Sequence, residues 1–157
     1  MRKLLAALAL WLATAALTSA PPFLSPPPGW VSVENPKSYG KVRILAMWRE
    51  PGTPRIAQNL SLGIQHFSAS LATYAAVTDQ TLHSGPLKPT RYADVPYACT
   101  RGPARLLVYE TSFFGLPLHF EQIFIKRADD VYVATYTRGI KQVQNVLAAR
   151  ALRGVCR

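Results

Sequence analysis

The most regular pattern of apolar and polar positions lies near the C-terminal end, in residues 130–157. Side chains in segment 131–136 alternate with the period of two of a β-strand, with Tyr132, Ala134 and Tyr136 on one face. Segment 142–153 follows with helical spacing, and Gly154 suits a left-handed residue after a helix. We expect the helix to bury these residues on the sheet: Val143, Val146, Leu147, Ala148 and Ala151. The rest of the chain is expected to pack against this strand and helix.

Upstream segments predict more strands and one more helix. Alternation indicates strands at 30–33, 42–48 and 59–67, and the last of these directs Leu60, Leu62 and Ile64 to one face. A helix is expected to start near Ser68 or Ser70, because serine caps free backbone N–H groups. Its apolar stripe comprises Leu71, Tyr74, Ala75, Thr78 and Leu82. Further strands are expected at 91–94, 97–99, 105–111 and 118–125.

Short connectors between these later strands predict an antiparallel meander. The fold class is therefore expected to be α+β, with an antiparallel β-sheet covered by helices. Residues 30–157 have a length that suits a single domain.

The N-terminal residues have the pattern of a secretory signal peptide. Arg2 and Lys3 precede an apolar run from residue 4 to 17, and small residues at 18–20 suit cleavage after Ala20. The apolar run is too short for the roughly 20 residues of a membrane-spanning helix. Residues 21–29 contain five prolines and are expected to form a semi-extended leader. The sequence therefore predicts an exported protein, periplasmic or extracellular, with no transmembrane span after cleavage.

The chain is basic, with 18 Lys and Arg against 8 Asp and Glu and a net charge of +10. Removal of residues 1–20 takes away Arg2 and Lys3 and no acidic residue, so the remaining net charge is +8. The charge is consistent with a solvated surface, or with an anionic partner such as lipid head groups or acidic glycan. Nucleic acid is a weaker candidate, because no recognised binding module accompanies the charge.

The two cysteines, Cys99 and Cys156, both lie in the segment expected to be exported. An oxidising compartment favours a disulfide between them. The alternative is a reactive thiol at Cys99, beside Arg101.

Signals for catalysis are few. The sequence has no nucleophile elbow, phosphate-binding loop or zinc-binding motif, and no catalytic, metal or cofactor site is predicted. His119 and Glu121 share one face of an expected strand and could form an acid–base pair, although simple cross-strand pairing explains them too. Several aromatic residues fall at element ends, where they could rim a binding groove or close the core: Trp30, Tyr39, Trp48, Phe113 and Phe114.

The order of elements and four local features resemble PsbP/Mog1-like domains. These features are Pro28-Gly29-Trp30, Leu45-Ala46-Met47-Trp48 before a Pro-Gly loop, segment 59–64 before a Ser-led helix with Tyr74, and segment 131–138 before a helix ending in cysteine. That family includes photosystem-associated extrinsic proteins and small bacterial envelope proteins and lipoproteins. The resemblance covers most of residues 28–157 and implies an α-β-α sandwich. It supplies no functional residue, because family members bind different partners.

The function expected from these features is a non-catalytic exported binding or accessory domain, acting in the cell envelope or outside the cell. Its partner would be an envelope protein or an anionic surface. Two alternatives stay open, namely a small secreted hydrolase that uses His119 with Glu121, and a structural subunit of an envelope assembly.

Overall fold

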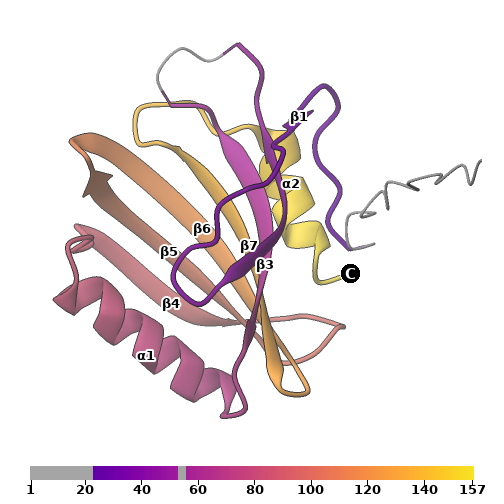
Figure 1. Cartoon of the computed structure of the whole chain (residues 1–157), viewed down its shortest axis with the longest axis vertical. Coiled ribbons are helices and arrows are strands. Elements are labelled where there is room, and N and C mark those ends of the chain that lie inside the picture. The colour runs from indigo at the N-terminus through magenta and orange to yellow at the C-terminus, as the bar shows by residue number, and fades with distance from the viewer. Residues whose placement is uncertain (1–22, 53–55) are drawn as a thin grey trace, which may run out of the picture.

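The computed structural model describes residues 23–52 and 56–157, which form one seven-stranded antiparallel sheet and two helices (Figure 1). The strands are β1 Val31–Ser32, β2 Arg43–Arg49, β3 Asn59–His66, β4 Arg91–Tyr97, β5 Ala104–Phe113, β6 Leu116–Arg127 and β7 Asp130–Gly139. The helices are α1 Leu71–Ser84 and α2 Val146–Gly154. This architecture confirms the predicted α+β class. The predicted signal peptide, residues 1–20, lies outside the described residues.

Strand β7 is the middle strand of the sheet, whose order is β1-β2-β3-β7-β6-β5-β4. It pairs with β3 on one side, where Leu62 lies opposite Ala134, and with β6 on the other, where Ile123 lies opposite Ala134. Strands β4 to β7 form the predicted meander. The expectation that the fold is organised around the C-terminal strand is confirmed.

One face of the sheet is covered by α2. Leu60, Leu62, Ile123 and Tyr136 project from β3, β6 and β7 and are almost completely buried, together with Leu152 of α2. The chain before β1 also belongs to this core, because Leu24 is only 2% exposed and Phe23 makes an edge-to-face contact with Tyr132. The Pro-rich segment therefore packs on the domain from Phe23 onwards, which its sequence did not indicate.

The other face is partly covered by α1, which packs on β5, β6 and β7. Leu71, Tyr74 and Leu82 of α1 contact a group that includes Leu107 and Phe124. Ser70 caps the helix as predicted, since its hydroxyl accepts a hydrogen bond of 3.1 Å from the backbone N–H of Thr73. In Figure 1, α1 spans only one end of this face.

The predicted burial of α2 is wrong in part. The helix starts at Val146 rather than at residue 142, and Val143, Val146 and Leu147 are 87%, 66% and 48% exposed. Ala149, which lay outside the predicted stripe, is buried. Gly154 is the last residue of the helix and is not left-handed.

The start of α2 is fixed by polar contacts that helical periodicity could not reveal. The Asn145 side chain accepts hydrogen bonds from the N–H groups of Leu147 and Ala148, and its own N–H donates to the Tyr136 hydroxyl at 3.0 Å. The Tyr136 hydroxyl in turn donates to the Gln58 side chain. These contacts attach the start of α2 to β7 and to the segment before β3.

Residues 91–97 form one strand, β4, instead of the two predicted strands at 91–94 and 97–99. Pro96 lies within it, and among the described strands β4 lies at the edge of the sheet and pairs only with β5. An edge position tolerates proline because its missing N–H faces away from the ladder.

The predicted disulfide between Cys99 and Cys156 is present. It links the segment after β4 to the end of α2, and both the N–H and the hydroxyl of Thr100 donate to the Cys156 carbonyl at 3.0 Å. A disulfide favours an oxidising compartment. Within residues 23–52 and 56–157, neither helix is long and apolar enough to cross a membrane.

Candidate functional site

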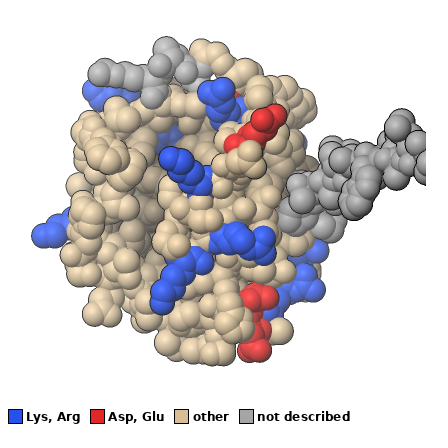
Figure 2. Space-filling model, in the orientation of Figure 1, with Lys and Arg blue, Asp and Glu red and all other residues tan. Residues whose placement is uncertain are grey.

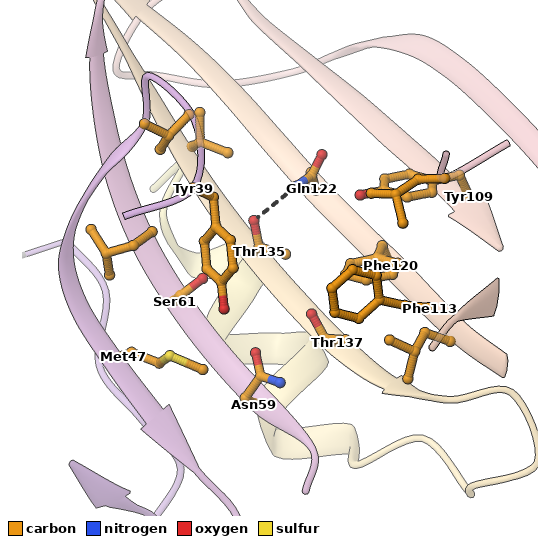
Figure 3. Close-up of a pocket in the computed structure, with 15 residues that line it drawn as sticks. Tyr39, Met47, Asn59, Ser61, Tyr109, Phe113, Phe120, Gln122, Thr135 and Thr137 are labelled. Atoms are coloured by element: carbon orange, nitrogen blue, oxygen red, sulfur yellow. Dashed lines mark hydrogen bonds between the residues drawn. The ribbon is translucent and has the colours of Figure 1, made fainter. Parts of the chain in front are cut away.

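A cavity of about 310 Å³ opens on the α1 face of the sheet, next to the part that α1 covers (Figure 3). Its floor is made by β3, β7 and β6, and its walls come from β2, β5 and the loops before β2 and β4. The lining residues are Tyr39, Val42, Ile44, Met47, Asn59, Ser61, Leu87, Tyr109, Phe113, Leu118, Phe120, Gln122, Val133, Thr135 and Thr137.

The floor is hollow because β3 and β7 carry small side chains on this face. Ser61, Thr135 and Thr137 point into the cavity, whereas the large alternating residues of the same strands point into the opposite core. Gly63 continues the row of small residues on β3. A Cβ atom there would lie 2.5 Å from Cγ1 of Val42, so glycine allows the wall residue Val42 to lie close over the sheet.

The polar groups of the cavity lie in two neighbouring rows across the strands. One row runs Met47, Ser61, Thr135 and Gln122. Within it, Nε2 of Gln122 donates to Oγ1 of Thr135 at 3.1 Å, the contact drawn in Figure 3. The next row runs Asn59, Thr137, Phe120 and Tyr109. Hydroxyl and amide groups thus form a stripe through a mainly apolar surface.

Aromatic rings form the walls and the rim. Tyr109 and Phe120 stack with ring centroids 4.7 Å apart, and Figure 3 shows the Tyr109 hydroxyl directed toward the cavity. Burial raises the pKa of Tyr109, so its phenol is neutral and can donate a hydrogen bond. Tyr39 lies on the opposite side of the cavity from Phe113, and both are partly exposed.

None of the fifteen lining residues carries a formal charge. A charged ligand in this cavity would lose hydration without gaining an ion pair from the lining. A mainly apolar lining with a few placed polar groups is the usual composition of a small-molecule site, and 310 Å³ is near the lower end of the range of roughly 300–1,000 Å³ for such sites.

The aromatic residues considered as groove residues divide between the two faces. Tyr39 and Phe113 line the cavity, and the adjacent Phe114 is 89% exposed and contacts Phe113 at 4.4 Å between ring centroids. Trp30 and Trp48 instead pack into the core under α2. The polar stripe was not predicted, because strand order decides which residues of β3, β6 and β7 become neighbours.

His119 and Glu121 are neighbours as predicted, but they lie away from the cavity. Nδ1 of His119 is 3.2 Å from a carboxylate oxygen of Glu110, and Nε2 is 3.5 Å from Glu121. Gln144 donates to Glu121 at 2.8 Å. The hydrogen bond with His119 lowers the pKa of Glu121 below its ordinary value, aided by the charge of Arg153, and these effects outweigh burial.

His119, its two carboxylate neighbours and Arg153 form a network of ionisable groups between the sheet and α2. The imidazole nitrogens contact two carboxylates, one on each side, and neither contact is to a hydroxyl nucleophile. His66 and His83 lie elsewhere, paired with Asp130 and Asp79. Among the residues that the structure describes, no group of three His, Cys, Asp or Glu side chains could hold a metal ion.

A second, more open cavity lies between α1 and β4. It is lined by Ala72, Ala75, Ala76, Asp79, Tyr92, Asp94 and Arg105. Its one cationic side chain is already engaged, because Nε of Arg105 donates to Asp94 at 2.7 Å. This pairing leaves the first cavity as the better candidate for a binding site.

In the part of the chain that the structure describes, basic side chains do not line the cavity. Figure 2 shows Lys and Arg as separate groups with uncharged surface between them. Lys37, Lys41 and Arg43 are exposed on the segment that contains Tyr39 and leads into β2. The charge is therefore a property of the outer surface and not of the cavity lining.

Fold and site together define an α+β protein with an uncharged cavity on the partly open face of an antiparallel sheet. No family model and no curated protein matches the sequence. Among solved structures, the chain is similar to the crystal structure of PA94 from Pseudomonas aeruginosa, a protein of unknown function, with a TM-score of 0.48 and 21% identity. The match covers 71% of this chain and 83% of that one. A likeness at this level says nothing about function.

Proposed function

We propose that this protein is a non-catalytic exported binding domain, acting in the cell envelope or outside the cell, and that the cavity on the α1 face is its binding site. The observation that carries the proposal is the cavity lining, in which hydroxyl and amide groups form a stripe between aromatic and aliphatic walls. Such a surface binds and orients a small ligand. The disulfide between Cys99 and Cys156 supports an oxidising location.

Within the α+β class, we propose that the fold is an α-β-α sandwich of the PsbP/Mog1 type. The support is the division of the apolar residues into two core groups, one packed with α1 and one packed with α2. The two groups use alternate residues of β6 and β7, so they lie on opposite faces of the sheet.

Binding of N-phenyl-1-naphthylamine tests the proposal, because this uncharged dye fluoresces when it enters an apolar site. We expect saturable binding by the wild-type protein and strong loss in Ser61→Phe, whose ring would occupy the cavity floor. Ser32→Phe is the matched control, because Ser32 is exposed and pairs with Trp48 on the α2 side. Absence of saturable binding, or equal binding by both variants, would contradict a binding role for the cavity.

The exposed basic residues support an additional interaction with an anionic surface. Lys37 and Lys41 flank Tyr39, which is 63% exposed, so this loop presents cations beside an aromatic ring. We expect the protein to co-sediment with phosphatidylglycerol vesicles at low salt and to be released as salt rises. Lys37→Glu/Lys41→Glu should weaken the interaction, and lack of binding at low salt would remove this part of the proposal.

The two other functions have less support from the geometry. A hydrolase based on His119 would need a cavity and a nucleophile beside the imidazole, whereas His119 lines neither cavity and its nitrogens contact carboxylates. A structural subunit would show a stoichiometric protein partner in a pull-down from an envelope fraction. That result, combined with no dye binding, would favour the structural role over the proposed one.

A further inference from the structure

We infer that the cavity on the α1 face selects uncharged, mainly apolar molecules that carry a hydroxyl or carbonyl group. This inference rests on the proposed binding function and adds the chemical class of the ligand. It is carried by two observations about the lining, namely the absence of any charged side chain among its described residues and the position of the polar stripe.

The uncharged lining disfavours ionic ligands. All fifteen lining residues are uncharged, and the histidine and carboxylates of the β5–β6 region, His119, Glu110 and Glu121, are absent from the lining. An ionised ligand would therefore leave water without a counter-charge in the lining, which is a large penalty. The positive surface charge of the protein does not change this, because it acts on encounter and not inside the cavity.

The polar stripe favours a ligand with a hydrogen-bonding group. Ser61 and Thr137 are buried on the cavity floor, each with a hydroxyl that can donate and accept. The Tyr109 phenol points into the cavity from the wall. A wholly apolar ligand would cover these groups without replacing their hydrogen bonds to water, which costs affinity.

The aromatic walls of the cavity favour a particular shape for the apolar part of the ligand. Phe120 is stacked on Tyr109, while Phe113 and Tyr39 stand on opposite sides of the cavity (Figure 3). Aromatic rings at such positions favour a flat or ring-bearing apolar body. The volume of about 310 Å³ accommodates a small molecule.

Four naphthalene compounds separate these requirements, because they share one apolar body. They are 2-naphthol, which is uncharged at neutral pH, naphthalene itself, 2-naphthoate and 2-naphthylmethylammonium. Each is tested as a competitor of bound N-phenyl-1-naphthylamine. We expect 2-naphthol to compete about threefold to tenfold better than naphthalene. The anion and the cation should each compete roughly tenfold or more weakly than 2-naphthol.

The double variant Ser61→Ala/Thr137→Val then tests the stripe itself. It should remove the advantage of 2-naphthol, because 2-naphthol loses its hydrogen-bond partners while naphthalene no longer covers polar groups and binds as well or better. A general loss of packing would instead weaken both compounds. Thr81→Val is the matched control, because Thr81 lies on α1 and its hydroxyl bonds to the Val77 carbonyl. The comparison of the four compounds on the wild-type protein does not depend on whether the double variant folds.

Competition by 2-naphthoate or by the ammonium compound equal to that of 2-naphthol would overturn the inference and leave the binding function standing. Equal competition by naphthalene and 2-naphthol would do the same. Survival of the 2-naphthol advantage in the double variant would exclude the stripe as its cause. Failure of the dye to bind at all would instead remove the proposed function on which the inference rests.

Discussion

The two faces of the sheet are built by the same strands but carry different kinds of side chain. On β3 and β7, Leu60, Leu62 and Tyr136 point toward α2 and are completely buried, whereas Ser61 and Thr137 of the same strands point toward the cavity. The α2 face is closed by a helix, by the segment at Leu24 and by a disulfide. The α1 face is closed only in part. The α2 face is thus filled by packed side chains, whereas the α1 face combines a core under α1 with an open cavity.

Residues on the α2 face therefore stabilise the fold, whereas residues in the cavity on the α1 face are available to contact a ligand. Changes on the closed face are expected to reduce the free energy of unfolding, and changes in the cavity are expected to alter binding with little effect on stability. Three measurements test this difference between the two faces.

The largest effect is expected from the disulfide on the closed face. Cys99 and Cys156 are 57 residues apart, and a crosslink over such a loop contributes about 4 kcal/mol by restricting the unfolded chain. Cys99→Ser/Cys156→Ser should lower the free energy of unfolding in urea by that order. A loss below about 1 kcal/mol would show that the buried apolar residues alone hold the closed face together.

The next effect contrasts two adjacent residues of β3. Leu62→Ala should cost about 3 kcal/mol, because it removes a fully buried side chain and leaves a cavity in the core. Ser61→Ala, one position earlier and on the other face, should cost less than about 1 kcal/mol. Urea denaturation of both variants provides the comparison. Similar losses would contradict the division between the two faces.

The smallest effect concerns the polar end of the closed face, where Glu121 contacts His119 and Gln144. Because the pKa of Glu121 is lowered in the folded protein, its contribution to stability is present above the unfolded pKa near 4.5 and is lost as the pH falls through the folded pKa. We expect Glu121→Gln to flatten the fall in stability from about pH 5 to about pH 3.

The control for that measurement is Glu34→Gln, at an exposed position before β2. It should leave the acid profile of the wild type unchanged. A profile for Glu121→Gln that is as steep as the wild-type profile would mean that other carboxylates control the acid response.

Local signals in the sequence were sufficient for much of the fold. Alternation located β3 and β7, and serine capping placed the start of α1 near Ser68 or Ser70, of which Ser70 is the cap. The two cysteines paired as expected. The two strands and the start of the helix depend on residues that are close in sequence. The disulfide could be predicted because each cysteine has only one possible partner in the chain. The start of α2 was misplaced, because Asn145 is held by Tyr136 on β7 and by Gln58, and Gln58 is distant in sequence.

The candidate site was harder to predict, for a reason that lies in the sheet order. Ser61, Thr135 and Gln122 form one polar row only because β3 and β6 both pair with β7. Tyr39 and Phe113 could be noted as aromatic residues near element ends, but nothing local distinguished them from Trp30 and Trp48, which are packed in the core. Sequence spacing within one strand carries no information about its neighbours.

The central place of β7 also has a consequence for the order in which the chain can fold during synthesis. Strands β1 to β3 form one group and β4 to β6 another, and β7, close to the C-terminal end, is the strand that joins them. Until β7 emerges, β3 and β6 each present an unpaired edge that can associate with other chains. Completion of the sheet must therefore wait until β7, the last of the seven described strands along the chain, has been made.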